Sequence, residues 1–307
     1  MIIAPTLAIL AVITAADSSP FAGVFVISGF ASDSLIVVDA ATGELQHTIH
    51  DNNLDGPLGM TLAPDRDELL VCSELTGSVE RYDTNTWQHL GALINKGEGG
   101  LEKPASIIPT ADNNSLLVAD FESSSILQFN AKTGAFERTI VEPKAGNLLG
   151  PDVGMTLTTE GQLLVPSFWN HQLIAYDISD PNQTNAETLA THQQGIRRPR
   201  TILQLDDGSI LITNEAAATV TRVSADFSMF DPHIEDSPAT KANETGGLQA
   251  PSGMTIGPEG DLYITDVNQN RVMQYDLETG KYLGTPVPKN TGGIQAPTFI
   301  LYIPPAN

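Results

Sequence analysis

The sequence predicts an all-β fold, a six-bladed β-propeller of four-stranded blades, and three observations predict it. A proline begins a similar unit six times, at spacings of 46 to 52 residues, at Pro57, Pro104, Pro151, Pro199, Pro251 and Pro297. Each unit holds short runs rich in Val, Ile, Thr and aromatic residues, separated by turns rich in Gly, Asp and Asn. No stretch shows sustained helical periodicity, which excludes an α-solenoid as the source of the repeat.

The four strands of a unit follow in the same order each time. In the last complete unit the first strand is PSGMTI, the turn GPEGD follows, and LYITD forms the second strand. The third strand is RVMQYD, and the turn LETG leads into the fourth. Four short antiparallel strands in about 45 residues describe one propeller blade. The complete blades are predicted over residues 57–94, 104–141, 151–190, 199–234 and 251–287.

The remaining blade is predicted to come from both ends of the chain. Residues 24–50 match the second, third and fourth strands of a unit, and the first strand is absent there. The segment APTFILYIP, at 296–304, has the pattern of that first strand. We therefore expect the C-terminal strand to complete blade 1, which closes the ring and removes an exposed sheet edge. The propeller is predicted over residues 20–305.

The N-terminal residues 1–19 are predicted to form a signal peptide. An apolar run of the length of a secretory h-region ends in the small residues Ala15 and Ala16. We therefore expect a secreted or periplasmic protein. The run is shorter than the roughly 20 residues that a helix needs to cross a bilayer, so a membrane-spanning protein is not expected.

Charge and cysteine content exclude several kinds of partner and bond. The chain has 37 Asp and Glu against 15 Lys and Arg, a formal charge of −22, which repels nucleic acid and predicts a solvated acidic surface. The single cysteine, Cys72, lies in the apolar run ELLVCSE, where we expect a buried structural thiol and no intramolecular disulfide. We expect a monomer whose partner is a small molecule, a glycan or a protein.

The repeated unit resembles the NHL-type propeller repeat. The resemblance is carried by the pattern PSGMTIGPEGDLYITDVNQNRVMQYDLETG and its copies, and it covers residues 24–303. It is specific for the fold. Propellers of this kind include binding modules, lyases and lactonases, so the resemblance does not fix an activity.

One set of candidate site residues follows the repeat prolines, where a propeller presents side chains to the mouth of its channel. The set is Leu58, Ala105, Asp152 (or Val153, because this copy has one extra residue), Arg200, Ser252 and Thr298. The similar gluconolactonase and paraoxonase-like propellers hold a divalent cation near this position with Asn and Asp. Leu, Ala and Arg at three of the six positions disfavour a calcium-dependent lactonase. We expect no cofactor, with calcium as the alternative.

A second candidate lies in the segment PSFWNHQ. The streptogramin-lyase propellers, which have a similar repeat texture, have seven blades and a catalytic His and Glu, and no such motif matches here. His171 is placed beside Phe168 and Trp169 on a loop of the channel mouth, where it could act as a general base above aromatic rings. The alternative is that Trp169 packs between blades and His171 is an exposed loop residue.

The segment GIRRPRT concentrates positive charge at the start of blade 5. Arg197, Arg198 and Arg200 are 3 of the 15 basic residues and lie near the expected channel mouth. Guanidinium groups bind carboxylate and phosphate in a bidentate manner, so one hypothesis is that this segment binds an acidic small molecule or an acidic glycan. Pairing with neighbouring acidic loops of the same chain is the other, favoured by the acidic composition.

A third set ends the second strand of each blade: Gly29, Ser73, Asp120, Ser167, Asn214 and Asp266. We expect Asp120, Asn214 and Asp266 to accept hydrogen bonds from the backbone of the loop that follows each of them. A cation held by these three side chains together is the alternative.

The sequence therefore predicts a binding or interaction module whose specificity lies in the channel-mouth loops. The alternatives are a propeller enzyme, either a lyase or a hydrolase of lactones or other cyclic esters, and a structural component with an apolar outer rim. The predicted ligand-binding residues are Asp152, Trp169, His171, Arg197, Arg198, Arg200, Ser252 and Thr298.

Overall fold

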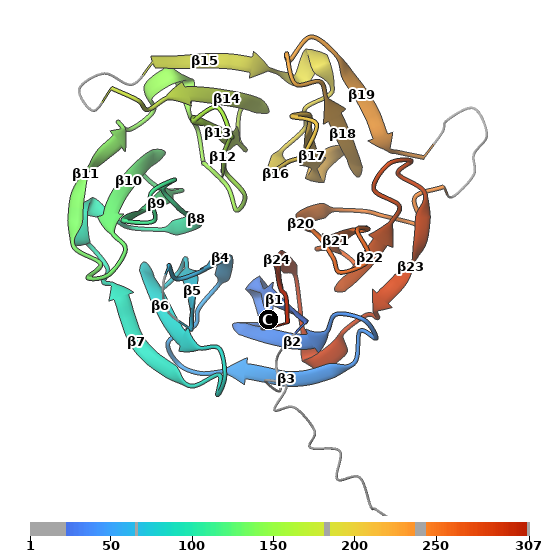
Figure 1. Ribbon diagram of the computed structural model, residues 1–307, viewed down its shortest axis with the longest axis horizontal. Coiled ribbons are helices and arrows are strands. Elements are labelled where there is room, and N and C mark those ends of the chain that lie inside the picture. The colour runs from blue at the N-terminus through green and yellow to red at the C-terminus, as the bar shows by residue number, and fades with distance from the viewer. Residues whose placement is uncertain (1–22, 65–66, 181–184, 237–243, 306–307) are drawn as a thin grey trace, which may run out of the picture.

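A computed structural model describes residues 23–64, 67–180, 185–236 and 244–305. Over these residues the strands form six four-stranded antiparallel sheets arranged as the blades of a ring. Figure 1 shows the first strand of each blade nearest the axis and the fourth strand at the rim. The prediction of a six-bladed β-propeller is confirmed. The predicted signal peptide, 1–19, lies outside the described residues.

The blades follow the chain order. Blade 2 holds β4 (Pro57–Leu62), β5 (Glu68–Ser73), β6 (Ser78–Asp83) and β7 (His89–Ile94), and blade 3 holds β8 (Pro104–Pro109), β9 (Ser115–Asp120), β10 (Ser125–Asn130) and β11 (Phe136–Val141). Blade 4 holds β12 (Thr156–Leu157), β13 (Gln162–Ser167), β14 (Gln172–Asp177) and β15 (Asn185–Ala190). Blade 5 holds β16 (Pro199–Gln204), β17 (Ile210–Asn214), β18 (Thr219–Val223) and β19 (Phe230–Ile234), and blade 6 holds β20 (Pro251–Ile256), β21 (Leu262–Asp266), β22 (Arg271–Tyr275) and β23 (Tyr282–Val287).

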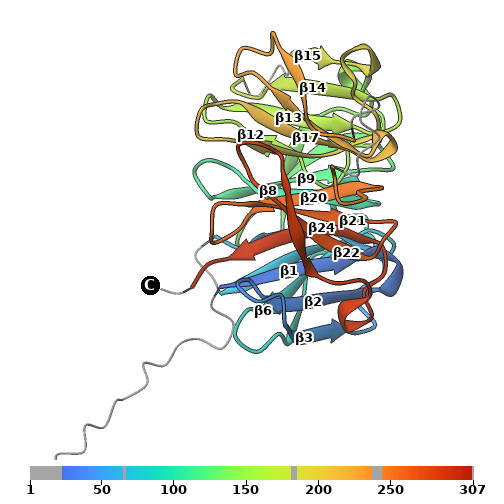
Figure 2. The ribbon, with the colours of Figure 1, turned by 90° about the vertical axis from the view of Figure 1, so that its right-hand side faces the viewer.

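Blade 1 contains both ends of the described chain, as the sequence predicts. Its strand order is β24 (Pro297–Ile303), β1 (Val24–Gly29), β2 (Ser34–Asp39) and β3 (Leu45–His50). β24 pairs antiparallel with β1 from Val24 opposite Ile303 to Gly29 opposite Pro297. Figures 1 and 2 both place the two strands side by side. The C-terminal strand therefore closes the ring.

The core lies between the blades, because each sheet packs face to face on its neighbours. The second strands read as nearly continuous apolar runs, such as LLVC in β5 and LLVA in β9, and these residues are buried on both faces. Cys72 lies in this layer, fully buried, and burial raises the pKa of its thiol. The predicted structural thiol is in the predicted place.

Short 3₁₀ helices lie in the loops of the channel-mouth face. They are η1 (Phe30–Ser32), η2 (Glu98–Gly100), η3 (Ala145–Asn147), η4 (His192–Gln194), η5 (Glu215–Ala217) and η6 (Thr291–Gly293). No helix among the described residues is long and apolar enough to cross a membrane.

The first strand of blade 4 departs from the pattern of the other blades. Pro151 makes an isolated bridge to Ser167, and Gly154 then pairs in parallel with Thr201 of blade 5. The Gly154 N–H donates to the Arg200 carbonyl at 3.0 Å. A Cβ on Gly154 would lie 2.6 Å from the Thr201 side chain, so glycine permits this approach. The start of blade 4 thus lies against the first strand of blade 5.

Candidate functional site

Two rings of side chains surround the mouth of the channel. The loop ring contains the first residue after each second strand: Phe30, Glu74, Phe121, Phe168, Glu215 and Val267. The strand ring contains the residue after each repeat proline: Leu58, Ala105, Asp152, Arg200, Ser252 and Thr298. Each ring takes one residue from every blade, so the repeat itself places twelve positions around the axis.

Members of both rings enclose a cavity of about 170 Å³ on the axis of the propeller. Every blade contributes to its wall, which is formed by Phe30, Leu58, Glu74, Phe121, Asp152, Phe168, Arg200, Val267, Ala296 and Thr298. We call this cavity the mouth pocket. Its wall is mostly apolar, and its ionisable groups are two carboxylates and one guanidinium.

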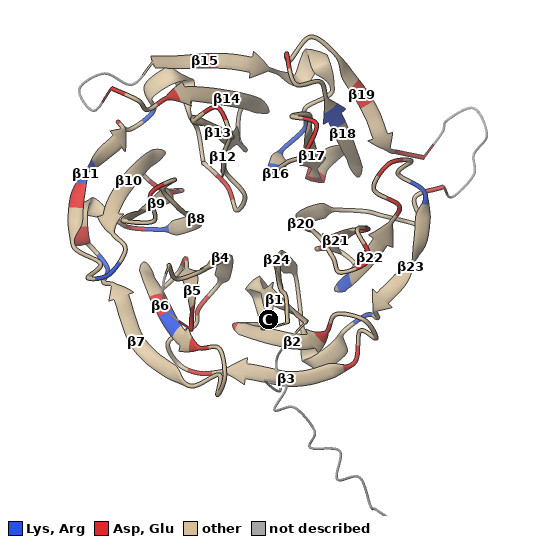
Figure 3. Ribbon diagram, viewed as in Figure 1, with Lys and Arg blue, Asp and Glu red and all other residues tan. Residues whose placement is uncertain are grey.

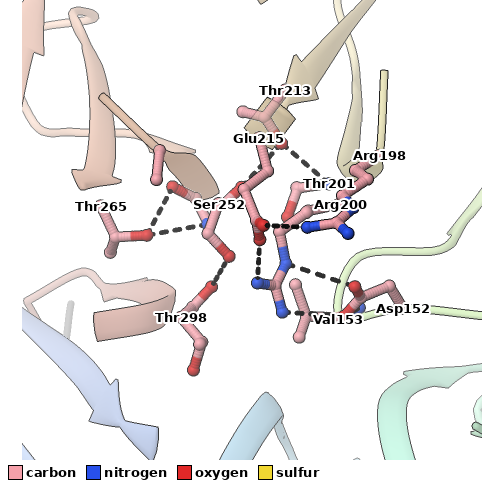
Figure 4. A network of polar contacts seen from close by, with 12 residues as sticks. Asp152, Val153, Arg198, Arg200, Thr201, Thr213, Glu215, Ser252, Thr265 and Thr298 are labelled. Carbon is pink, nitrogen blue, oxygen red and sulfur yellow. Dashed lines mark hydrogen bonds and ion pairs between the residues drawn. The ribbon is translucent and has the colours of Figure 1, made fainter. Parts of the chain in front are cut away.

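Arg200 lies between the carboxylates of Asp152 and Glu215 (Figure 4). Its Nε and Nη2 lie 3.3 Å from the two carboxylate oxygens of Asp152, and its Nη1 donates to Oε2 of Glu215. The side chains of Arg200 and Asp152 are only 12% and 3% exposed. The start of blade 4 lies against β16, which places Asp152 beside Arg200. Figure 3 shows the corresponding basic segment on β16 close to the axis.

Both carboxyl groups of the mouth pocket have a raised pKa. Burial raises the pKa of Asp152 to about 6, although the neighbouring Arg200 guanidinium acts in the opposite direction. Burial is also the main cause of the raised pKa of Glu74, with Asp152 adding to it and Lys103 and Arg200 opposing it. Burial in the pocket therefore favours the protonated form of both carboxyl groups.

An aromatic cluster covers one side of the mouth. Trp169 is 55% exposed and its ring meets Phe121 of blade 3 at 6.0 Å and Phe168 at 4.9 Å. The guanidinium carbon of Arg198 lies 5.2 Å from the centre of the Phe168 ring and 5.7 Å from that of Trp169. Trp169 thus packs between mouth loops of blades 3 and 4, at the surface and not in the core between the sheets.

His171 lies in the same loop but is not among the residues that line the mouth pocket. Its Nδ1 accepts the backbone N–H of Arg198 at 3.0 Å, so one ring nitrogen is already used to hold the start of blade 5. Desolvation, followed by Arg197 and Arg198, lowers the pKa of His171. The hydrogen bond to Nδ1 and the lowered pKa both favour the neutral imidazole, and its role as a base stays a prediction.

The three arginines of blade 5 differ in their surroundings. Arg200 is paired as described, and Nη1 of Arg198 lies 3.7 Å from Oε1 of the same Glu215. Arg197 is exposed, and its backbone N–H donates to the side chain of Asn214. Pairing within the chain, the second of the two hypotheses for this segment, therefore describes Arg198 and Arg200.

Ser252 and Thr298 belong to a belt of hydrogen bonds that joins neighbouring blades inside the channel (Figure 4). The Ser252 hydroxyl donates to the Thr298 carbonyl at 2.7 Å, and Thr213 of blade 5 donates to the Ser252 carbonyl at 2.8 Å. The Thr298 hydroxyl donates to the Pro57 carbonyl of blade 2 at 3.3 Å. Thr298 also lines the mouth pocket, whereas the buried Ser252 does not.

Asp120, Asn214 and Asp266 bind a different loop from the one predicted. Asp120 accepts the N–H of Lys103 at 2.7 Å, Asn214 accepts that of Arg197 at 3.1 Å, and Asp266 accepts those of Gln249 and Ala250. These donors precede the blade's first strand by one or two residues. The expectation that the side chains bond the backbone of the following loop is wrong, because the end of the second strand lies beside the start of the first.

The same three residues are fully buried and come from blades 3, 5 and 6. Across the described ranges, no group of three or more His, Cys, Asp or Glu side chains is arranged to hold a metal ion. Asp152 and Glu215 both pair with Arg200.

Sequence reasoning missed most of the loop ring. Phe30, Glu74, Phe121, Glu215 and Val267 were not among the predicted site residues, although each directly follows a residue of the third candidate set. The sequence signal that could have found them is their position, one residue after each member of that set. A strand's last side chain turns inward to the sheet, and the next residue turns toward the axis.

Comparison with known proteins gives the fold. No protein-family model and no curated protein matches the chain. The solved structures that are similar to it include nidogen in a nidogen/laminin complex, with a TM-score of 0.71 and 13% identity over 91% of this chain and 98% of that one. A protein of unknown function from Bacteroides caccae has a TM-score of 0.64 and 16% identity over 92% and 99% of the two chains.

A third similar structure is a catalytically inactive virginiamycin B lyase from Staphylococcus aureus with quinupristin. Its TM-score is 0.60 and its identity 12%, over 92% of this chain and 93% of that one. At such low identity, a likeness shows the fold and leaves the activity open. The chain is similar to β-propellers that bind a protein and to β-propellers that are enzymes.

Proposed function

We propose that this chain is an exported, NHL-like propeller that acts as a protein-interaction module through its channel-mouth face. One side chain of the partner enters the mouth pocket. The observation that carries this proposal is the pocket itself, a cavity of about 170 Å³ on the axis, walled by residues of every blade.

The size of the pocket favours a side chain over a free small molecule. Sites for drug-sized ligands enclose roughly 300–1,000 Å³. The mouth pocket is smaller than that range, and the buried ion pairs of Arg200 lie along its wall. Small, desolvated pockets near the centre of an interface are where single anchoring side chains contribute most of the binding energy.

The surface beside the pocket is suited to a protein partner. Leu75 and Trp169, which follow Glu74 and Phe168 in their loops, are 49% and 55% exposed. Large apolar side chains with this exposure beside a pocket, surrounded by polar loops, are typical of interaction surfaces. The nidogen structure in a laminin complex is an example of a similar fold with a protein partner.

A photo-crosslinking experiment tests the proposal. A photoreactive phenylalanine analogue replaces Trp169 in one variant and Leu283, which is 47% exposed on β23, in the control. We expect a discrete adduct with one protein of the native environment from position 169 only. Equal adducts from both positions, or none from position 169 in any fraction of that environment, contradict the proposal.

Export is part of the proposal and has its own measurement. The predicted signal peptide should be removed close to Ala16, so the N-terminus of the secreted protein is determined by mass spectrometry. Retention of residues 1–16 on a cytoplasmic protein contradicts this part.

A propeller enzyme, either a lyase or a hydrolase of cyclic esters, is the second candidate. It is favoured by Glu74, a half-buried carboxyl with a raised pKa that lines the pocket and is thereby suited to proton transfer. The test measures turnover of lactones and cyclic depsipeptides, with and without added calcium. Turnover that is lost in Glu74→Gln supports the enzyme; equal rates in both proteins contradict it.

A further inference from the structure

Glu74 differs from the other acidic groups of the mouth because its carboxylate makes no hydrogen bond or ion pair with any residue in the described part of the chain. The nearest cations that influence it are Lys103 and Arg200. Lys103 Nζ already lies 2.6 Å from Glu122, and Arg200 is shared by Asp152 and Glu215. Among the groups that line the pocket, two carboxylates therefore face one guanidinium.

The neighbours of Glu74 in the loop ring are aromatic. Phe30 belongs to blade 1 and Phe121 to blade 3, so one phenyl ring lines the pocket on each side of the blade 2 carboxylate. The Phe30 ring and Leu75 also lie against Gly56, which fixes the position of this side of the mouth. The face of an aromatic ring carries partial negative charge and attracts cations.

The opposite half of the mouth has a different character. Phe168 of blade 4 already has the Arg198 and Arg200 guanidinium groups 5.2 and 5.4 Å from its ring centre. Two carboxylates neutralise Arg200 there. The half of the pocket formed by blades 1 to 3 is thus aromatic with one carboxylate, Glu74, and the nearby cation Lys103 pairs with Glu122.

We propose that the mouth pocket binds a primary ammonium group on an alkyl chain, as on a lysine side chain of the partner. The ammonium pairs with Glu74 between Phe30 and Phe121, and the alkyl stem lies against Leu58. This inference rests on the proposed function and names the anchoring group. Lysine fits better than arginine, because the pocket is small and a compact ammonium on a flexible alkyl stem needs less room than a planar guanidinium.

The test compares three probes of equal chain length: pentylammonium, pentan-1-ol and pentanoate. Binding is followed by NMR shifts of the pocket residues in wild type, in Glu74→Gln and in the control Glu142→Gln. Glu142 is an exposed carboxylate on the same face, so the control makes the same change in net charge.

In wild type and in Glu142→Gln, we expect pentylammonium to bind about tenfold more tightly than pentan-1-ol, the effect of one desolvated ion pair with its cation–π contacts. Pentanoate should bind most weakly, and Glu74→Gln should abolish the difference between the ammonium and the alcohol. Preferential binding of pentanoate, equal binding of all three probes, or no shift of any pocket residue overturns the inference.

The outcome separates this inference from the proposed function. If position 169 crosslinks to a protein but the pocket shows no preference for pentylammonium, the proposed interaction face is supported and the ammonium pocket is refuted. Binding of pentylammonium that depends on Glu74, without any crosslink from position 169, supports the ammonium pocket and refutes the protein partner.

Discussion

Arg200 is the residue on which the arrangement of the mouth depends. Its guanidinium joins Asp152 of blade 4 to Glu215 of its own blade, and it is 12% exposed. Replacing a buried ion pair by apolar side chains is often neutral, but removing one partner leaves the other charge buried and uncompensated. The contribution of Arg200 is therefore best measured against an arginine of the same segment that is less buried.

Arg200→Met should lower the free energy of unfolding by about 3–5 kcal/mol, because Asp152 then stays buried without its cation. Arg198→Met is the matched control. Its side chain is 43% exposed and lies 3.7 Å from Glu215, so we expect a change of at most about 1 kcal/mol. Urea unfolding of both variants measures the difference. Equal losses in the two variants would contradict a special role for Arg200.

The pH dependence of stability tests the balance between burial and pairing at Asp152. Its pKa of about 6 in the folded protein lies above the ordinary value of 3.8, so between these values the folded state binds more protons than the unfolded state. The contribution of Asp152 to the free energy of unfolding should therefore fall as the pH rises from about 4 to about 6, by an amount on the order of 1–3 kcal/mol, and stay at the lower level above that window.

Asp152→Asn removes this contribution and supplies the comparison. The difference in unfolding free energy between wild type and Asp152→Asn, measured by urea titration, should fall with pH over the same window. A difference that instead grows as the pH rises would mean that Arg200 outweighs burial and that the pKa of Asp152 is lowered.

At the scale of elements, one contact recurs in every blade: the end of the second strand accepts a backbone N–H from the loop that enters the first strand. The acceptor is a hydroxyl, amide or carboxylate oxygen of the strand's last residue. In blade 1, where the strand ends in glycine, the acceptor is the hydroxyl of Ser32. The donors are the backbone N–H groups of Asp55, Lys103, Leu149, Arg197, Ala250 and Gln295. The contact fixes where each mouth loop begins.

Asp120→Ala tests the contribution of this contact. The carboxylate is fully buried and accepts the N–H groups of Glu102 and Lys103, which the variant leaves without an acceptor. We expect a loss of about 2–3 kcal/mol of stability and faster amide exchange at those two positions. Asp120→Asn should recover most of the loss, and Asp206→Ala, on an exposed turn, should have little effect. A negligible loss of stability in Asp120→Ala would mean that this hydrogen-bond contact does not stabilise the blade.

The elements also show what a sequence can predict here. The blades follow from proline spacing and strand pattern, because both repeat with the structure, and the same spacing placed Asp152 and Arg200 near the axis. The prediction of the hydrogen-bond partner of Asp120 was wrong, because pairing between strands brings Asp120 beside Lys103, 17 residues earlier in the chain. Glu74 and Phe121 were missed, because which residue of a loop turns toward the axis depends on the geometry of the whole ring.

At the scale of the whole molecule, the ring is closed by β24. This strand pairs with β1, and its Thr298 bonds to blades 2 and 6 within the inner belt. It contributes Phe299, Leu301 and Ile303 to the apolar layer between blades 1 and 2. Because each blade is stabilised mainly by its neighbours, an opening at one blade weakens the packing of the two beside it.

Deletion of residues 297–307 should therefore destabilise the ring as a whole, lowering the melting temperature by about 10 °C or more and broadening the transition. The matched control is a circular permutant in which 296–304 are moved ahead of Gly23 through a short turn. Val24 and Ile303 lie opposite each other in the β1–β24 pair, so this turn forms an ordinary hairpin. The permutant keeps every strand and should melt close to wild type. If the deletion variant melts like wild type, the C-terminal strand does not close the ring. If the deletion variant and the permutant both melt early, the chain connection between β23 and β24, and not the pairing of β24 with β1, stabilises the propeller.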